Sequence, residues 1–226
     1  MSAPQIKSNA EKASAARRRG LETSERILDA AEDCFARKGF AGTTLRDVAD
    51  HVGIRIPSLY NHFPNKDALY AAVLHRGISP LLALLAQSIK DSPKGYPDPK
   101  ETVMAVMEWL SLRANLPRLV QYELLAGGER LAPLLAEGLR PAMAQSLAIL
   151  EANPAMERWR PEEIPFVLLA LFNIVVGHFT TSALTESLSP DPARTQEGTA
   201  AAARVYGQLV ETLLQEAPPP PKRNED

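Results

Sequence analysis

Apolar residues recur at helical spacing along most of the chain, and this pattern is the first guide to its fold. Two clear stripes are formed by Leu45, Val48, Ala49 and Val52, and by Val103, Val106, Met107 and Leu110. Such spacing places the apolar side chains on one face of a helix. No alternating β-branched run bounded by turns is found, so strands are not expected. We therefore predict an all-α protein of about nine helices.

The segment from Thr44 to Phe63 predicts two short helices joined by a tight turn. Thr44 followed three residues later by Asp47 is typical of a capping box, in which each residue binds a backbone N–H of the first turn. Gly53 follows the last apolar position, where a left-handed residue ends many helices. Pro57 falls in the first turn of the next helix, where its missing N–H is not needed. Together these features predict a helix-turn-helix, whose second helix lies in the major groove of DNA.

Further helices are predicted on both sides of this motif. One runs from about residue 23 to 38 and ends at Gly39, and another begins at Lys66 with Asn65 as its cap. After Gly77 the chain becomes leucine-rich, and helices are expected at about 78–89, 100–115, 117–126, 129–151, 161–184 and 194–215. The predicted parts of the chain are a basic flexible arm (1–20), a three-helix helix-turn-helix domain (21–70), a larger helical domain (71–216) and a disordered, proline-rich tail (217–226).

Basic residues are concentrated near the start of the chain, although the net charge is −2. Residues 1–76 hold 12 Lys and Arg against 9 Asp and Glu, whereas the rest holds 13 against 18. Five basic side chains lie in the first 20 residues: Lys7, Lys12, Arg17, Arg18 and Arg19. This arm either contacts DNA phosphates or is an ordinary solvated terminus.

The predicted helix at 161–184 has no polar face across its middle. The run from Leu168 to Val176 is interrupted only by Asn173. A helix that is apolar all round must be buried all round. A second subunit is the simplest cover for its outer side, so we predict a homodimer that forms through the two C-terminal helices with isologous contacts. The alternative is a central helix that is buried inside one monomer.

A set of residues through the first third of the chain has the order and spacing of a known family. These residues are Ile27 to Ala31, Phe35, Gly39, Phe40, Thr44, Val48, Ala49, Gly53, Leu59, Tyr60, His62, Phe63, Lys66 and Leu69. On them the chain resembles the tetracycline-repressor (TetR-type) family of bacterial transcription regulators. The resemblance implies that the first third binds a double-stranded DNA operator, and that the rest forms the dimer and binds a small-molecule effector. The chain departs from the family at Arg55, where a small polar residue usually caps the helix.

Candidate DNA-binding residues lie at two helix starts and on the short second helix. Thr44 and Lys66 begin helices, and the N-terminus of a helix attracts phosphate through its backbone N–H groups and its dipole. The exposed side of the second helix is expected to carry Arg55, Ser58, Tyr60, Asn61 and His62. Arg pairs with guanine and Asn with adenine in the major groove. Tyr60 and His62 are alternatively packing residues between helices.

Large or polar side chains on the apolar helices of the larger domain are candidate effector contacts. They are Trp109, Arg113, Tyr122, Phe172, Asn173 and His178. Ligand pockets are mostly apolar and have a few converging polar groups. Asn173 and His178 are therefore candidates for orienting a small, largely apolar effector. For most single members of the set, an ordinary place in the core is the alternative.

The sequence does not favour an enzyme, a metal site or a secreted protein. It has no glycine-rich phosphate loop, no His-Glu-x-x-His pattern and no nucleophile elbow, and its four His and one Cys are scattered. Residues 1–20 lack the apolar core of a signal peptide, and the longest near-apolar run, 164–179, is short for a membrane span. We expect a cytoplasmic repressor without cofactor. Two alternatives stay open: an all-α catalytic or carrier domain that uses a C-terminal cavity, and an architectural DNA binder without an effector.

Overall fold

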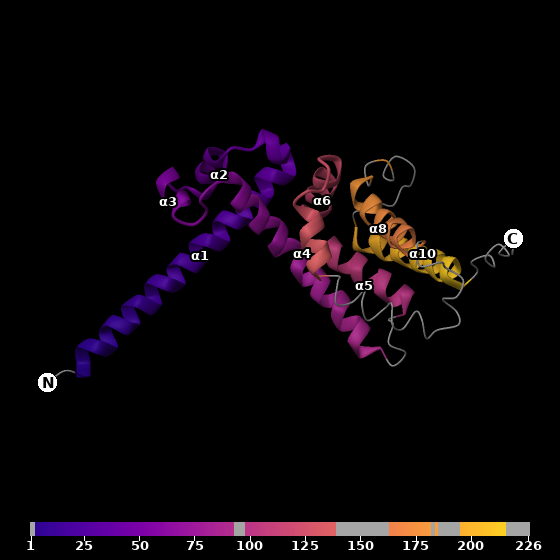
Figure 1. The fold of residues 1–226 in the computed structure, drawn as a ribbon, viewed down its shortest axis with the longest axis horizontal. Coiled ribbons are helices and arrows are strands. Elements are labelled where there is room, and N and C mark those ends of the chain that lie inside the picture. Colours follow the sequence, from indigo (N-terminus) through magenta and orange to yellow (C-terminus); the bar gives the residue numbers. More distant parts are fainter. Residues whose placement is uncertain (1–2, 93–97, 139–162, 182–183, 185–194, 216–226) are drawn as a thin grey trace, which may run out of the picture. The chain divides into compact units, whose positions relative to one another are not determined.

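The computed structural model describes residues 3–92, 98–138, 163–181, 184 and 195–215, and the chain divides into two compact units, Met1–His75 and Arg76–Asp226. The described residues contain eight helices with defined bounds and no strand (Figure 1), which confirms the all-α prediction. The predicted tail and the predicted helix beyond residue 138 lie outside the described residues.

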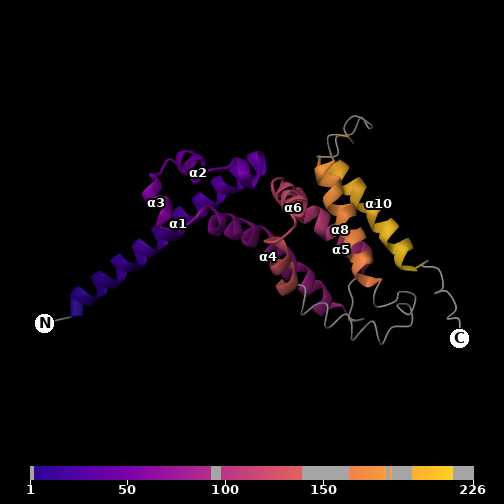
Figure 2. The same ribbon diagram turned by 45° about the horizontal axis from the view of Figure 1, so that its top comes forward.

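The first unit contains α1 (Ala3–Gly42), α2 (Leu45–Val52), α3 (Ile56–Tyr60) and the first part of α4 (Lys66–Asp91), as Figures 1 and 2 show. The prediction of a flexible arm is wrong for residues 3–20, because α1 already begins at Ala3. This segment is rich in Ala, Lys and Arg, which are good helix formers. Gly20 does not separate an arm from the helix, since a glycine inside a helix costs only about 1 kcal/mol relative to alanine.

Gly39 interrupts the helical geometry of α1 close to its end. Its φ of 70° and ψ of 173° lie in a region that a residue with a Cβ rarely adopts. The first helix is predicted to end at this residue, and the backbone turns there. Residues 40–42 then continue toward α2 as a short helical piece.

The core of the first unit is built around aromatic rings from α1 and α4. The rings of Phe35 and Tyr70 meet edge to face with their centroids 4.7 Å apart, and Phe40 lies 5.0 Å from Tyr70. Aliphatic side chains from all four helices complete this core: Ile27, Leu28, Val48, Leu59, Leu69, Val73 and Leu74. Cys34 is buried among them, as its place on the apolar face of the first helix predicts.

α4 was expected to end near Gly77, but it continues to Asp91. Pro80 lies inside the helix and removes one backbone hydrogen bond, but it does not end the helix. Gly77 is there for close packing, because a Cβ at this position would lie 2.6 Å from Cδ1 of Leu116. Residues 66–88 are long and apolar enough to cross a membrane by length and composition alone, a test that the core helix of a soluble protein also passes.

The second unit contains the rest of α4 together with α5 (Pro99–Ser111), α6 (Leu116–Leu125), α8 (Ile164–Thr180) and α10 (Gln196–Gln215). Residues 131–138 are also helical. α5 packs most extensively on α10, and α8 contacts α5, α6 and α10. α8 and α10 lie side by side in both ribbon views (Figures 1 and 2). Gly207 permits the close approach of α10 to α5, since a Cβ there would lie 2.8 Å from Cγ of Lys100.

Apolar side chains remain exposed on α8 and α10. On α8, Phe166 is 71% exposed and Leu169 is 52% exposed; on α10, Val205 is 56% and Leu209 is 50% exposed. Asn173 is also exposed and lies on the face of α8 that carries Phe166 and Leu169, because residues three, four and seven apart share one side of a helix. A helix without a polar face is therefore only partly covered within a single chain.

Candidate nucleic-acid interface

The predicted capping box is present at the start of α2. Oγ1 of Thr44 accepts a hydrogen bond from the backbone N–H of Asp47 at 3.1 Å. In return, Oδ2 of Asp47 accepts from the backbone N–H of Thr44 at 2.7 Å and from its hydroxyl at 2.6 Å. Because the Thr44 hydroxyl is already hydrogen-bonded to Asp47, an anion at this helix end would be bound by the backbone N–H groups of the first turn.

A lysine on α1 pairs with the carboxylate of this capping box. Nζ of Lys38 donates to Oδ1 of Asp47 at 2.7 Å. This hydrogen bond, followed by those from Thr44, holds the pKa of the Asp47 carboxyl well below its usual range. The Asp47 carboxyl beside the N-terminus of α2 is therefore ionised and paired with the Lys38 ammonium.

The turn between α2 and α3 has the left-handed glycine that the sequence predicts. Gly53 has a φ of 76° and a ψ of 36°, and its N–H donates to the carbonyl of Ala49 at 3.0 Å. Arg26 on α1 adds a contact that the sequence did not suggest: its Nη2 donates to the carbonyl of Val52 at 2.8 Å. The periodicity of one helix does not reveal which side chain reaches the end of another.

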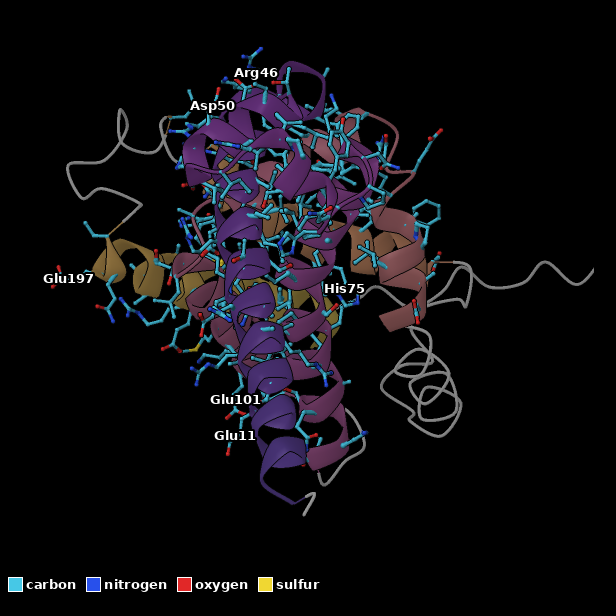
Figure 3. The ribbon with its side chains drawn as sticks, turned by 90° about the vertical axis from the view of Figure 1, so that its left-hand side faces the viewer. Glu11, Arg46, Asp50, His75, Glu101 and Glu197 are labelled. Atoms are coloured by element: carbon cyan, nitrogen blue, oxygen red, sulfur yellow. The ribbon has the colours of Figure 1, made fainter. Side chains whose placement is uncertain are left out.

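α3 presents part of the predicted base-reading set to solvent. Arg55, Tyr60 and Asn61 are exposed, whereas Ser58 and His62 are half-buried. Arg55 is the N-cap residue of α3 and makes no side-chain capping bond, because a guanidinium has no acceptor atom for the N–H groups of the first turn. Leu59 is buried and Phe63 is 9% exposed, as expected for the residues that hold α3 on the core. Figure 3 labels Arg46 and Asp50, two further exposed side chains, on neighbouring α2.

Lys66 does not project into solvent as a side chain that binds a phosphate would. Its Nζ donates to the carbonyl oxygens of Phe40 at 2.9 Å and Thr43 at 3.1 Å. The same nitrogen lies 4.3 Å from the centroid of the Phe40 ring. The side chain is half-buried, and its charge is directed toward the segment between α1 and α2.

Thr43 was not singled out from the sequence, although it is completely buried. Its hydroxyl donates to the carbonyl oxygens of Gly39 at 2.8 Å and Cys34 at 3.1 Å. The sequence feature that could have revealed Thr43 is the pair of threonines before α2. Only Thr44 fits the capping pattern, and Thr43 fixes the connection that leads into the helix.

The six candidate effector contacts occupy different environments. Trp109 and Arg113 come together, with the guanidinium carbon 3.8 Å from the centroid of the indole ring and Nη1 donating to the Trp109 carbonyl at 3.1 Å. His178 is buried, and its Nδ1 lies 3.4 Å from the hydroxyl of Tyr206 on α10. The other three are Tyr122, which is 39% exposed, Phe172, which is half-buried, and Asn173, which is exposed.

Asn173 has a local role that the sequence did not suggest. Its Nδ2 donates to the carbonyl of Leu169, one turn earlier on α8, at 2.8 Å. Together with its exposure, this bond places Asn173 on the uncovered face of α8.

Glu123 on α6 is a buried charged residue that was not singled out from the sequence. It is 1% exposed and continues the buried stripe of Leu116, Leu119 and Val120. Nη1 of Arg130 lies 3.6 Å from Oε1, and Oε2 has no hydrogen-bond partner among the described residues. The sequence feature that could have revealed it is its helical spacing, because Glu123 stands at a position where the periodicity of α6 predicts an apolar residue.

A family profile and curated relatives both show similarity to bacterial regulatory proteins. The sequence profile described as "Bacterial regulatory proteins, tetR family" matches residues 27–73. The HTH-type transcriptional regulator RutR of Escherichia coli K12 is 34% identical over 120 residues, which cover 50% of this chain and 51% of RutR. The HTH-type transcriptional repressor KstR2 of Rhodococcus jostii is 44% identical over 48 residues, or 21% of this chain and 24% of KstR2. The chain spans about half the length of RutR and a quarter of KstR2.

A solved structure extends the likeness in fold. A bacterial regulatory protein of the tetR family from Rhodococcus RHA1 superposes with a TM-score of 0.65 at 23% identity, covering 85% of this chain and 96% of that one. The matched profile begins in α1, contains α2 and α3 and ends in α4, so it coincides with the capping box, the glycine turn and the exposed face of α3. Residues 27–73 are thus similar to the bacterial regulatory proteins of the tetR family, and the fold of the chain is that of a solved tetR-family structure.

Proposed function

We propose that the protein is a transcription regulator that binds a near-palindromic operator as a homodimer, acts as a repressor and is released by a small, largely apolar effector. The observation that carries the DNA-binding part is the geometry of α2, its turn and α3. The capped end of α2 leaves backbone N–H groups for a phosphate, and α3 directs Arg55, Tyr60 and Asn61 outward. Repression is the sign of regulation named for one relative, KstR2, which matches over 48 residues.

Selection of binding sites from a pool of random DNA duplexes tests this proposal. A symmetric dimer that uses two helix-turn-helix motifs should enrich an inverted repeat with half-sites about 34–36 Å apart, or a multiple of one DNA turn. Enrichment of a single asymmetric half-site would contradict the dimeric arrangement. A pool without any enrichment would contradict sequence-specific DNA binding.

The proposed dimer uses the exposed apolar face of α8 and α10. These two helices pack on each other, and each exposes large apolar side chains. A second copy of the chain would cover both with the same surface from each side, as an isologous interface requires. Residues from two helices per subunit would then form a four-helix contact. Asn173 would lie at this interface, where its amide already has an acceptor on its own helix.

The proposed effector site lies in the second unit. Trp109 and Arg113 offer an aromatic face with a guanidinium above it, and buried His178 offers a polar group on α8. A ligand changes DNA affinity only if it binds one conformation better than another, and a tenfold loss of operator affinity needs about 1.4 kcal/mol of such preference. Native mass spectrometry of protein purified from its own host should detect a retained small molecule. Protein that is free of ligand in every preparation and inert to extracts of its host would favour the architectural alternative.

The basic N-terminal part of α1 is proposed as an additional DNA contact. Arg17, Arg18 and Arg19 are all exposed, and the one described ion pair among them joins Arg18 to Glu22 at 3.6 Å. Such an exposed pair contributes little to stability and yields easily to a phosphate. A regulator with this function would act in the cytoplasm, where the DNA is.

A further inference from the structure

We propose that Lys66 is a positioning residue that fixes the start of α2 against the start of α4, and not a cation that binds a DNA phosphate. The consequence for affinity rests on the proposed DNA-binding function. The contact itself lies wholly within the first unit and can be tested without DNA.

The geometry of Lys66 is that of a cation that caps the end of another helix. It is the first residue of α4, and its ammonium binds the carbonyl oxygens of Phe40, in the last turn of α1, and of Thr43, the residue that follows α1. The last carbonyls of a helix have no partner within that helix, and a cation at this end also complements the helix dipole. The Phe40 ring, 4.3 Å from Nζ, adds a second attraction for the charge.

The two acceptors belong to the short segment that leads into α2. Thr43 immediately precedes Thr44, the N-cap of α2, and its hydroxyl ties it to α1 through the carbonyls of Gly39 and Cys34. Lys66 ties the same residue to α4. The backbone that enters α2 is thus held from α1 by one side chain and from α4 by another.

Binding of a phosphate by Lys66 would compete with this arrangement. An ammonium has three N–H donors, and two of them are used by carbonyl oxygens. The side chain is half-buried, so the charge can reach a phosphate only by giving up bonds that hold the entry to α2. The N-terminus of α2 can bind a phosphate through its own backbone N–H groups, provided that it is held in place.

The test compares three full-length variants with the wild-type protein. Lys66→Met keeps the length of the side chain but removes its donors, and Lys66→Arg keeps the charge and at least two donors. Lys90→Met is the matched control, because Lys90 is an exposed lysine in the last turn of the same helix. Binding to a short duplex of random sequence is measured from about 50 to 200 mM salt. Amide hydrogen exchange of residues 43–48 is measured in the same proteins without DNA.

We expect Lys66→Met to exchange faster at residues 43–48 and to bind DNA about tenfold more weakly, a change of about 1.4 kcal/mol. The slope of log affinity against log salt should equal that of the wild type, since the number of neutralised phosphates stays the same. Lys66→Arg should restore both exchange and affinity, and Lys90→Met should change neither. A destabilised fold would instead raise exchange throughout α1 as well.

Two results would overturn the proposal. One is a salt slope that falls by about 0.9 in Lys66→Met, the value expected when one phosphate is no longer neutralised. The other is unchanged exchange at residues 43–48, which would show that the ammonium does not hold this segment. If the wild-type protein fails to bind the duplex at low salt, the proposed DNA-binding function fails, while the exchange measurement still decides the role of Lys66.

Discussion

Lys38 on α1 and Asp47 on α2 are joined by a hydrogen bond of 2.7 Å between Nζ and Oδ1. Asp47 also closes the capping box with Thr44, so one carboxylate stabilises the first turn of α2 and links this helix to α1. An unpaired carboxylate at this end would repel a phosphate. Because Lys38 lies beside it, the Asp47 carboxylate can remain ionised without repelling a phosphate.

The first prediction concerns the pH dependence of stability. The lowered pKa of Asp47 means that its ionised form stabilises the folded state fully above the unfolded-chain pKa of about 3.9. This contribution is lost as the pH falls through the lower pKa of the folded state. Denaturant unfolding of wild type and Asp47→Asn should therefore show a stability difference at pH 7 that shrinks in acid below about pH 4. Asp50→Asn controls for the loss of one negative charge on α2. A difference that stays constant into strong acid would contradict this role of Asp47.

The second prediction concerns sequence readout by α3. Arg55→Ala and Asn61→Ala should each relax preference at one position of the selected site, at a cost of about 1–3 kcal/mol on the best sequence. The reason is that each exposed side chain can form two hydrogen bonds to a single base. Competition binding against single-base variants of the site measures this. Arg118→Ala, at an exposed arginine of α6, is the matched control and should leave the preference unchanged. Equal losses on all sequences would show that these residues contact only the backbone.

The third prediction concerns the basic start of α1. Replacing Arg17, Arg18 and Arg19 together by Ala should weaken DNA binding and lower the salt slope by up to about 0.9 for each phosphate that is no longer neutralised. Alanine favours helix, so circular dichroism should show no loss of helical content. Deletion of residues 1–19 should have at least the same effect. If the triple variant and the deletion both keep the wild-type slope, this part of the helix is only solvated.

The fourth prediction concerns the dimer. Leu169→Glu combined with Leu209→Glu should yield a monomer of 24.7 kDa in sedimentation, because two charges per chain would have to be buried in the proposed contact. Leu125→Glu is the control, since Leu125 is 80% exposed on α6, outside that surface. Wild-type protein that sediments as a monomer at micromolar concentration would contradict the proposed assembly directly.

The fifth prediction concerns the buried carboxylate of α6. Glu123→Met should leave thermal stability unchanged or raise it, because a buried charge whose one partner among the described residues lies 3.6 Å away is often replaced by an apolar side chain at no cost. Arg130→Met should destabilise the second unit, since Glu123 would be left without its described ion-pair partner. Thermal unfolding of both variants measures this. A large loss of stability in Glu123→Met would indicate that Oε2 has an important partner.

Local features of the first unit were predictable from the sequence. The capping box of Thr44 and Asp47, the left-handed Gly53 and the proline at position 57 each depend on residues close together in the chain. Contacts between helices were not predictable in this way. The bonds of Arg26 to the end of α2 and of Lys66 to the end of α1 depend on how helices pack, which the period of one helix does not record.

The predicted helix boundaries are wrong at two glycines that do not end a helix. α1 begins well before Gly20, and α4 continues past Gly77. Gly39, by contrast, does interrupt a helix, because its φ is positive. A glycine that ends a helix and one that admits a neighbouring side chain look alike in a single sequence. In α4 the neighbour is Leu116, from a different helix.

The pairing of α5 with α10 sets the order in which the two units can be completed during synthesis. The residues of the first unit emerge together, so this unit can fold while translation continues at about 5–20 residues per second. α5 must wait until almost all of the described sequence has been made before α10 can cover it. For several seconds each nascent chain therefore carries a finished first unit and an unfinished second unit. A truncated transcript that lacks α10 would yield a chain in which α5 stays uncovered. Its apolar surface would then be recognised by chaperones and proteases.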